Sequence, residues 1–290
     1  MSDKALYKFV EGLWAMSEKD GLPPWERCTV DGIVGTGPVN AKTGKAYRGS
    51  NWLWLLMNGV DYAAGAKQWK SLGVTSIDRS QVLWILAPSR WITREDVSGT
   101  KHRFPIGWRG VKVYPHSAVK GWTPPAKPDV VPVDPIDAAE ALIAAMPNAP
   151  AVSFSDHATT GSYAPTLDAV TMPLRDHCRS AEHYYKTYLH ELAHSTGHAS
   201  RCKRDLTGFS GSHEYSREEL VAEFTAAFLA MRCGIHDATR ENSAAYIKSW
   251  RRFIAQDPKV FLSAVADAQK AAEYIAPEAS AEKSADTNAA

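Results

Sequence analysis

The chain has 290 residues, 44% of them hydrophobic and 22% charged, with 33 lysines and arginines against 32 aspartates and glutamates. This composition is typical of a globular protein, and the length is sufficient for two domains. No stretch approaches the roughly 18–20 uninterrupted apolar residues that a membrane helix needs, so we expect no membrane partner.

The cysteines and the first residues indicate the cellular compartment. The four cysteines form no CxxC pair; they are Cys28, Cys178, Cys202 and Cys233. Scattered cysteines of this kind are typical of reduced thiols in a cytoplasmic protein. Residues 2–19 predict an amphipathic helix rather than a signal peptide. We therefore expect a cytoplasmic protein.

Charge and tryptophan content divide the chain into two halves. Residues 1–125 hold 17 Lys and Arg against 10 Asp and Glu, whereas residues 126–290 hold 16 against 22. Nine of the ten tryptophans lie before residue 125. Two halves of such different composition predict two domains with separate functions.

The first half predicts a small, basic α+β domain over residues 1–122. Its expected elements are a helix over 2–19, a helix over 52–59 that closes at Gly59, and strands over 81–89 and 110–119. The segment "TPPAKPDVVPVDP", residues 123–135, has five prolines in thirteen positions and predicts a semi-rigid linker.

The second half predicts a mostly helical domain with a short sheet over residues 136–275. Its expected elements are a helix over 136–147 ended by Pro147, strands near 151–156 and 162–173, and helices over 181–197, 216–232, 240–255 and 259–275. The tail, residues 276–290, is small and polar and is expected to be disordered.

His190, Glu191 and His194 form the pattern H-E-x-x-H. On a helix, residues four apart share a face, so both imidazoles can bind one metal ion. Glu191 lies beside the first ligand, where a carboxylate can take a proton from water. Gly197 is expected to end the helix. The pattern predicts a catalytic metal centre rather than two histidines on a helix surface.

A catalytic zinc usually has a third protein ligand. Ser200 stands where a longer zincin motif has its third histidine, and His198 lies beyond the predicted helix. Glu219 and Glu223 share a face of the next helix, and their E-x-x-A-E spacing resembles the E-x-x-A-D helix of glutamate-liganded zinc peptidases. The resemblance implies that Glu219 binds the metal and Glu223 orients a ligating histidine. The reverse assignment, with Glu223 as the ligand, stays open.

Such a centre suits hydrolysis, with a peptide bond as the expected target and a protein as the expected substrate. We expect Zn²⁺, with Mn²⁺ or Co²⁺ as alternatives that accept similar ligands. The run 162–173 contains prolines that predict a sheet edge, along which a peptide could bind. The candidates for stabilising an oxyanion are Tyr163, His213 and Tyr215.

The first half mixes positive charges with flat rings. The segment "PVNAKTGKAYRGSNWLWLL" combines Lys42, Lys45 and Arg48 with the rings of Tyr47, Trp52 and Trp54, and Trp69 and Trp91 follow beside further basic residues. Single-stranded nucleic acid is held by cations along its phosphates and by rings beneath its bases. The alternative is that the tryptophans fill a core, and at least one of Trp52 and Trp54 is expected to be buried.

Together the two halves resemble the ArdC-type antirestriction proteins of plasmids and phages. The resemblance rests on "PPWE" (23–26), "PVNAKTGKAYRGSN" (38–51) and "GVKVYPHSAV" in the first half, and on "SYAPTLDAVTMP", "YYKTYLHELAHSTGHASRCKRDL" and "YSREELVAEFTAAFL" in the second. It implies an N-terminal domain that binds single-stranded DNA, largely independently of sequence, and a C-terminal zincin-like metallopeptidase domain. It covers residues 20–255, but 65–85 lack the basic hairpin that relatives have there.

The resemblance implies a set of DNA-binding positions in the first half. They are Asn40, Lys45, Tyr47, Arg48, Gly49 and Asn51, and the mixture of charges and rings adds Lys42 and Trp52 as candidates. Two structural alternatives stay open, because Gly44 and Gly49 could serve turns and Asn51 could cap a helix.

The predicted function is protection of incoming DNA from host restriction. Two rival readings remain. The first is a dedicated zinc protease whose N-terminal module docks a protein substrate. The second is a purely structural metal ion that links two helices and takes no part in catalysis.

Overall fold

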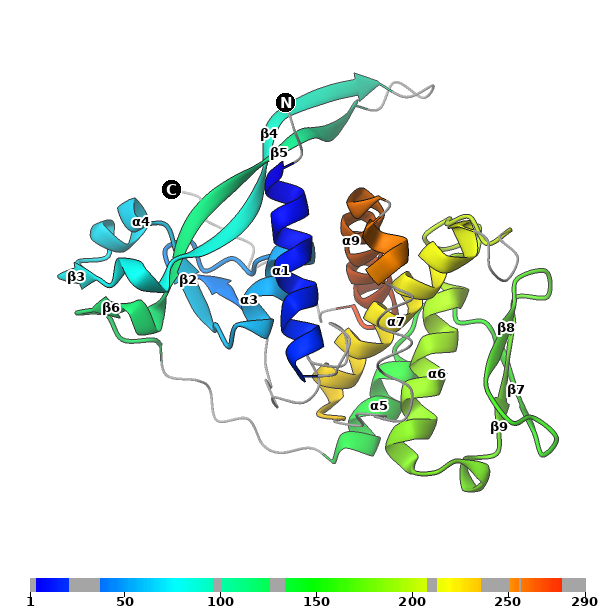
Figure 1. The fold of residues 1–290 in the computed structure, drawn as a ribbon. Helices are drawn as coiled ribbons and strands as arrows, with labels where there is room; N and C mark the ends of the chain where they lie inside the picture. Colours follow the sequence, from blue (N-terminus) through cyan, green and yellow to red (C-terminus); the bar gives the residue numbers. More distant parts are fainter. Residues whose placement is uncertain are drawn as a thin grey trace, which may run out of the picture. The chain divides into compact units, whose positions relative to one another are not determined.

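A computed structural model describes residues 4–20, 37–95, 101–125, 134–207, 213–235, 251–255 and 257–277. The chain forms two compact units (Figure 1). The first unit comprises Met1–Pro132 and His236–Ala266, and the second comprises Val133–Ile235 and Asp267–Ala290. The first division falls inside the proposed linker 123–135. The second division falls within the expected domain 136–275, whose C-terminal bound stays a prediction.

The first unit mixes short helices with a four-stranded sheet, in the α+β class that the sequence predicts. Its elements are α1 (Lys4–Asp20), β1 (Val39–Asn40), α3 (Gly49–Met57), β2 (Tyr62–Ala64), α4 (Ala66–Ser71), β3 (Ser76–Ile77), η1 (Arg79–Gln81), β4 (Leu83–Glu95), β5 (Lys101–Pro115), η2 (His116–Ala118) and β6 (Val119–Lys120). The sheet has the order β1-β2-β5-β4, and β3 pairs with β6 separately.

The β4–β5 hairpin is longer than the sequence predicts. Its antiparallel register runs from Leu83 opposite Val113 to Glu95 opposite Lys101. In Figure 1 it is a twisted ribbon whose outer half extends away from α3 and α4. Because β4 ends the sheet order, its outer edge has no strand neighbour in that sheet.

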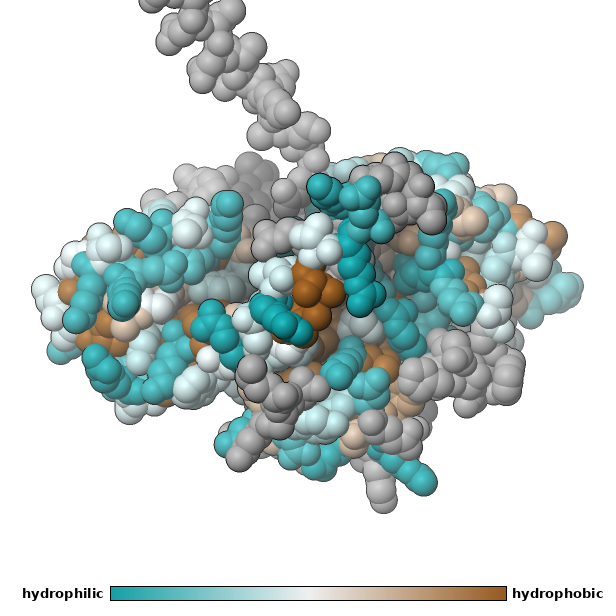
Figure 2. Space-filling view, turned by 90° about the horizontal axis from the view of Figure 1, so that it is seen from above, coloured by the Kyte–Doolittle hydropathy of each residue, from teal (hydrophilic) through white to brown (hydrophobic). Residues whose placement is uncertain are grey.

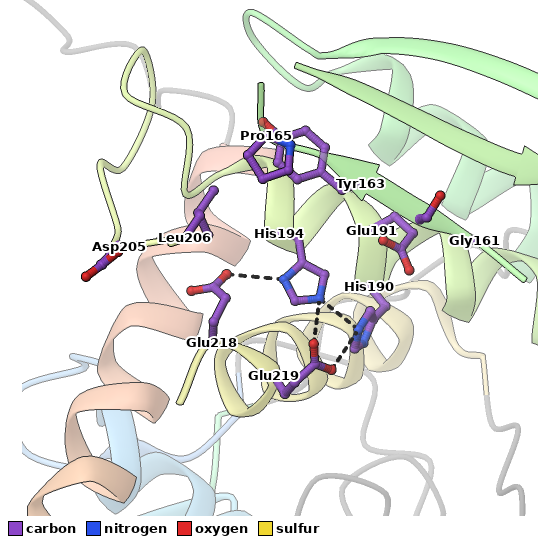
Figure 3. Close-up of a pocket in the computed structure, with 11 residues that line it drawn as sticks. Gly161, Tyr163, Pro165, His190, Glu191, His194, Asp205, Leu206, Glu218 and Glu219 are labelled. Carbon is purple, nitrogen blue, oxygen red and sulfur yellow. Dashed lines mark hydrogen bonds and ion pairs between the residues drawn. The ribbon is translucent and has the colours of Figure 1, made fainter. Parts of the chain in front are cut away.

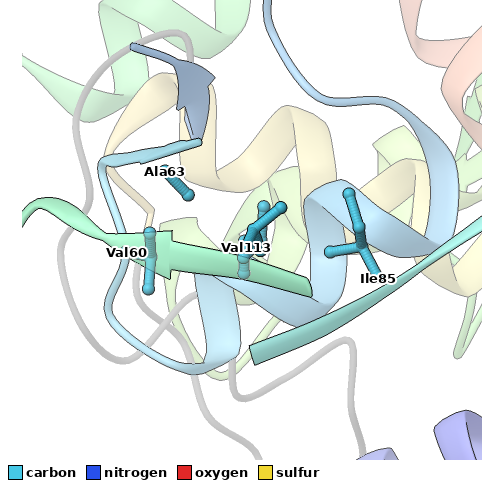
Figure 4. Close-up of a cluster of buried hydrophobic side chains, with 5 residues drawn as sticks. Val60, Ala63, Ile85 and Val113 are labelled. Carbon is cyan, nitrogen blue, oxygen red and sulfur yellow. The ribbon is translucent and has the colours of Figure 1, made fainter. Parts of the chain in front are cut away.

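The inner half of the hairpin packs on the core of the first unit. Five buried aliphatic side chains form one cluster: Leu55, Val60, Ala63, Ile85 and Val113 (Figure 4). Trp69 is also fully buried, and its indole Nε1 donates a hydrogen bond of 2.9 Å to the carbonyl of Tyr114. Trp69 is therefore a core residue, and only part of the tryptophan content is available for a ligand.

The second unit packs helices against a three-stranded sheet. Its elements are α5 (Pro135–Ala144), β7 (Ala151–Ser155), β8 (Ser162–Ala164), β9 (Ala169–Pro173), η3 (Arg175–His177), α6 (Ala181–Ser195), α7 (His213–Cys233) and the second half of α9 (Pro258–Ile275). In the sheet order β7-β9-β8, β7 is parallel and β8 antiparallel to the central β9. Helices α6 and α7 lie side by side (Figure 1).

The run 162–173, predicted as one edge strand, folds as two strands. Asp168 takes φ +48° in the turn between them, a left-handed conformation that aspartate tolerates better than most residues. As a result β8 lies at the sheet edge and β9 at its centre, so only the first part of the run offers a free edge.

Polar residues define where the helices of the second unit begin. Ser180 caps α6 by accepting a hydrogen bond from the backbone N–H of His183, and Asp134 caps α5. Helix α5 ends at Ala144, before the predicted stop at Pro147. Of the predicted helix 240–255, only residues 251–255 are described, and they are helical.

None of the helices in the described ranges has both the length and the apolar character needed to cross a membrane. The face drawn in Figure 2 is mostly hydrophilic, with small groups of hydrophobic residues between.

Candidate functional site

Helices α6 and α7 bring together two histidines and one glutamate of the second unit. One ligand atom from each of His190, His194 and Glu219 lies within 4.8 Å of the others. The two Nε2 atoms are 3.1 Å apart, and the Glu219 carboxylate oxygens lie 3.6 Å from that of His190 and 3.5 Å from that of His194. Figure 3 shows the three side chains pointing toward one common position.

This arrangement fits a divalent cation. Ligands at about 2.1 Å from a tetrahedral ion lie about 3.4 Å from one another, and the three separations of 3.1, 3.5 and 3.6 Å bracket that value. Two imidazoles and one carboxylate also leave a coordination position open, as in catalytic zinc centres. The cluster contains Glu219, and not Glu223, as its carboxylate ligand atom.

The electrostatics of the cluster favour a positive charge. Burial lowers the pKa of His190, but the hydrogen bond with Glu219 and the charges of Glu223, Glu191 and Glu219 outweigh it and raise the pKa to about 9. Three carboxylates around one imidazole therefore stabilise a cation at this place, which a bound metal ion would supply.

Glu191 is buried beside the cluster and held by the β8 edge. Burial raises the pKa of its carboxyl group, although the charges of the two histidines and a backbone hydrogen bond from Tyr163 oppose the shift. A Cβ atom at Gly161 would lie 2.7 Å from Cγ of Glu191, so only glycine lets the strand approach this closely. A carboxylate with a raised pKa beside an open cation position is suited to accept a proton.

Glu218 and Arg204 complete the centre, and the sequence analysis predicted no role for either residue. The Nδ1 atom of His194 lies 3.3 Å from Oε1 of Glu218, on the side of the ring away from Glu219. Arg204 donates to both oxygens of Glu218, at 2.7 and 2.8 Å, and also to the carbonyl of Ala193 at 2.8 Å. Glu218 thus lies at Nδ1 of His194, and the charge of Glu223 helps to raise the pKa of His190. The orienting role expected of Glu223 stays a prediction.

Of the three residues expected to stabilise an oxyanion, Tyr163 is the one whose side chain the structure describes. The hydroxyl of Tyr163 donates to Asp168 at 2.8 Å, and burial together with that hydrogen bond raises its pKa to about 12. This hydroxyl is committed to the β8–β9 turn, which argues against the predicted role. The side chains of His213 and Tyr215, in the first turn of α7, lie outside the described residues. Their proposed role stays a prediction.

A cavity of about 400 Å³ opens onto the centre (Figure 3). The β8 segment lines one side with Gly161, Ser162, Tyr163 and Pro165, and Asp205 and Leu206 line another. The metal-centre residues His190, Glu191, His194, Glu218 and Glu219 complete the lining. The cavity therefore exposes the candidate base and the open cation position next to an edge strand.

Gly197 serves this cavity in a way that the sequence did not predict. Helix α6 ends at Ser195, and Gly197 does not have the positive φ of a helix-ending glycine. A Cβ atom there would lie 2.7 Å from Cδ2 of Leu206. The glycine lets Leu206 pack against the end of the helix. His198, whose Nδ1 lies 2.8 Å from Oγ of Ser200, is not part of the metal cluster.

The side chains of Asn40 and Tyr47, two of the proposed DNA-binding residues, make hydrogen bonds inside the first unit. The Asn40 amide contacts the hydroxyl of Tyr47 at 3.2 Å and accepts from the N–H groups of Lys42 and Thr43. The Tyr47 hydroxyl donates to the carbonyl of Ala63. These contacts support an architectural role for Asn40 and Tyr47.

Asn51 bonds to β4 and does not cap a helix. Its side chain donates to the carbonyl of Leu86 at 2.7 Å and accepts from the N–H of the same residue at 2.8 Å. The N-cap of α3 is Arg48. The helix-cap alternative for Asn51 is therefore wrong. Its amide instead forms hydrogen bonds with the backbone N–H and carbonyl of Leu86 on the free edge of β4.

The remaining residues of the motif divide by exposure. Lys42, Lys45 and Arg48 are exposed, as phosphate-binding residues must be. Trp52 and Trp54 are both half-buried, so neither is the fully buried residue expected. Gly44 and Gly49 have φ of +68° and +56°, which supports the turn alternative for both. The "PPWE" segment lies outside the described residues.

Two family profiles match the two parts of the chain. Residues 6–104 match the N-terminal domain of anti-restriction factor ArdC, and residues 137–267 match the zincin-like metallopeptidase family.

Relatives match over most of the chain. The uncharacterized protein y4eC of Sinorhizobium fredii is 30% identical over 264 residues, which cover 87% of this chain and 84% of that protein. DNA primase TraC of Escherichia coli is 30% identical over 280 residues, or 89% of this chain, but these are only 26% of TraC.

Solved structures share the fold. The metal-free crystal structure of the antirestriction protein ArdC from plasmid R388 has a TM-score of 0.68 and 27% identity, and the Mn(II)-bound structure has 0.70 and 26%. Each match covers 93% of this chain and 96% of the other. The predicted α+β fold with a zincin-like C-terminal domain is confirmed.

Proposed function

The chain belongs to the ArdC-type family of antirestriction proteins, and from this premise we propose that it protects incoming plasmid or phage DNA from host restriction. In this proposal the first unit binds single-stranded DNA in the cytoplasm, largely independently of sequence. The second unit holds a zinc ion and acts as a metallopeptidase.

The observation that carries the enzymatic part is the convergence of His190, His194 and Glu219. A zinc ion held by these residues would polarise a carbonyl oxygen and acidify water. Glu191 takes the proton of the attacking water and later delivers it to the leaving amine. Glu218 holds His194 in one orientation through its Nδ1 atom.

A peptide substrate would lie along β8. This strand is at the sheet edge and lines the cavity, so a peptide added antiparallel to it passes the base. The backbone groups of the strand recognise any extended chain, which favours an unfolded segment as substrate.

A second candidate function is a dedicated zinc protease whose first unit docks a protein substrate. The placement of Glu191 favours it, because a protein that only binds DNA has no chemical need for a buried base beside a metal centre.

Fluorescence anisotropy tests the DNA-binding part. A labelled single-stranded oligonucleotide is titrated with the full chain at two salt concentrations, with duplex DNA as competitor. We expect salt-sensitive binding that duplex competes for poorly. Absence of binding at low salt would reject this part and leave a metalloprotease with an unknown docking module.

The Glu191→Gln variant separates the two candidate functions. Plasmid transfer into a restricting host is measured with the wild-type chain, with Glu191→Gln, and with a chain in which Lys42, Lys45 and Arg48 are all glutamine. If DNA binding protects, only the triple variant loses protection. If proteolysis is the active principle, Glu191→Gln loses it.

A further inference from the structure

A cavity of the first unit lies between α1, α3 and the inner half of the β4–β5 hairpin. Its volume is about 640 Å³, against about 400 Å³ at the metal centre. It is lined by Ala5, Lys8, Phe9, Trp54, residues 82–86 and Gly110. Cavities of about 300–1,000 Å³ accommodate small organic groups. None of the proposed DNA-binding residues between 40 and 52 lines it.

Trp84 forms an exposed wall of this cavity. Its side chain is 49% exposed, although a tryptophan usually gains stability from burial. A Cβ atom at Gly110 would lie 2.9 Å from Cε3 of the indole, so the ring lies against the bare backbone of β5. Glycine at this position is what allows the half-exposed ring to lie close to the strand.

Positive charges flank the same ring. The Nζ atom of Lys112, which lies opposite Trp84 in the hairpin register, is 5.0 Å from the centroid of the indole. Lys8 is exposed on α1 and lines the cavity. The described lining residues include no carboxylate, so the rim attracts anions while the interior is apolar.

We propose that this cavity binds one nucleobase of a DNA single strand, stacked on Trp84, with the neighbouring phosphates on Lys8 and Lys112. The proposal rests on single-stranded DNA binding as the function of the first unit. An apolar slot between two lysines matches a flat base carried on a charged backbone. Duplex DNA keeps its bases stacked inside and cannot place one there.

The lining also explains why the strand would be bound without sequence preference. Among the described lining residues, only Lys8, Trp54 and Trp84 carry polar side-chain atoms. Base identity is read by paired donors and acceptors on base edges, which amide and carboxylate side chains provide. Stacking on an indole accepts all four bases because each has a flat face.

The test compares two oligonucleotides of 20 positions, one of thymidines and one that is abasic throughout, by anisotropy with the full chain. We expect Trp84→Ala to weaken binding of the thymidine strand by about 5- to 100-fold and to leave the abasic strand unchanged within a factor of two. Trp84→Phe should recover most of the affinity. Gly110→Ala should weaken binding, because its methyl group displaces the indole without removing a ring or a charge. Lys112→Gln should weaken both strands and reduce the salt dependence.

The matched control is Trp91→Ala. Trp91 lies on the same strand and is 50% exposed, but it does not line the cavity. If Trp84→Ala binds the thymidine strand as the wild type does, or if Trp91→Ala loses as much, the base-binding cavity is rejected while DNA binding stands. If the wild type binds neither strand, the proposed function itself fails. A change of oligomeric state in Trp84→Ala would show that a second copy fills the cavity, and would overturn the proposal.

Discussion

The Nδ1 atom of His194 lies 3.3 Å from Oε1 of Glu218, and Arg204 holds that carboxylate from the other side with two hydrogen bonds. The Nε2 atom of the same imidazole faces His190 and Glu219. The imidazole of His194 is thus held by Glu218 on one side and faces His190 and Glu219 on the other. Burial acts to raise the pKa of Glu218, but the hydrogen bonds from Arg204 and with His194 outweigh it and lower the pKa, so the anchor remains a carboxylate at neutral pH.

Replacing Glu218 by glutamine is expected to weaken metal binding by about 10- to 100-fold. Residues that orient a ligating histidine typically contribute this much, because they fix the tautomer and the ring. Isothermal titration of the metal-free protein with Zn²⁺ and with Mn²⁺ measures the effect directly. If the affinity falls for only one of the two metals, Glu218 influences the preferred coordination geometry as well as the orientation of His194.

Glu223→Gln is the matched control for this prediction. Glu223 acts on His190 through its charge, whereas the hydrogen bond to Nδ1 of His194 belongs to Glu218. We expect Glu223→Gln to weaken metal binding less than Glu218→Gln does. The reverse order would support the orienting role predicted for Glu223.

Metal removal is expected to lower the melting temperature of the second unit. A ligand present at 100 times its Kd stabilises the folded state by about 2.7 kcal/mol, and chelation removes this contribution. Differential scanning calorimetry with and without a chelator measures the shift, which His194→Ala should abolish. Under a purely structural metal, Glu191→Gln would leave both this shift and all activity unchanged. Loss of proteolysis with an intact thermal shift would instead identify a catalytic centre.

The candidate metal ligands on α6 follow from the sequence because their geometry is local. Four residues along a helix determine which side chains share a face, so His190, Glu191 and His194 follow from spacing alone. Glu219 lies on a different helix, and it could be proposed only because its E-x-x-A-E spacing resembles the E-x-x-A-D helix of glutamate-liganded zinc peptidases. Glu218 and Arg204 could not be found, because their contacts arise where residues 196–207 pack back onto α7. Neighbouring helix residues point about 100° apart. The pair Glu218–Glu219 can therefore contact both nitrogens of one ring.

Asn51 shows why a motif can be recognised from sequence while a contact of one of its residues cannot be predicted. Its amide bonds both backbone groups of Leu86, which face the outer edge of β4. An edge strand leaves such groups without a strand partner, and they need another donor and acceptor. Which strand ends a sheet depends on tertiary pairing. No local spacing in residues 38–51 contains that information.

Gly161→Ala is expected to destabilise the second unit by about 1–3 kcal/mol, the usual cost of overpacking. The new Cβ atom would lie 2.7 Å from Cγ of Glu191 and 3.0 Å from Cγ2 of Thr187. Chemical denaturation measures the loss. Adding Thr187→Ser removes only the second contact, so it should restore little stability. Full recovery in that double variant would show that Glu191 moves aside without cost.

Asp168→Asn is expected to destabilise the folded protein at neutral pH and to flatten its response to acid. The carboxylate accepts hydrogen bonds from Arg201, whose side chain is fully buried, and from Tyr163. The hydrogen bond from Arg201 is the main cause that lowers the pKa of Asp168 below 3.8. Asparagine keeps the size of the side chain and tolerates the positive φ of this position, so the substitution isolates the charge.

The direction of the pH effect follows from the lowered pKa of Asp168. A carboxyl group with a lower pKa in the folded state contributes stability that is present above its unfolded pKa of 3.8 and is lost as the pH falls through its folded pKa. The wild type should therefore lose stability below about pH 4 more steeply than the variant. At pH 7 the variant should be less stable by about 1–3 kcal/mol, because donors of Arg201 are left without an acceptor. Urea denaturation at pH 3, 4 and 7 checks both expectations. Parallel acid profiles in the two proteins would show that the Asp168 charge does not stabilise the β8–β9 turn.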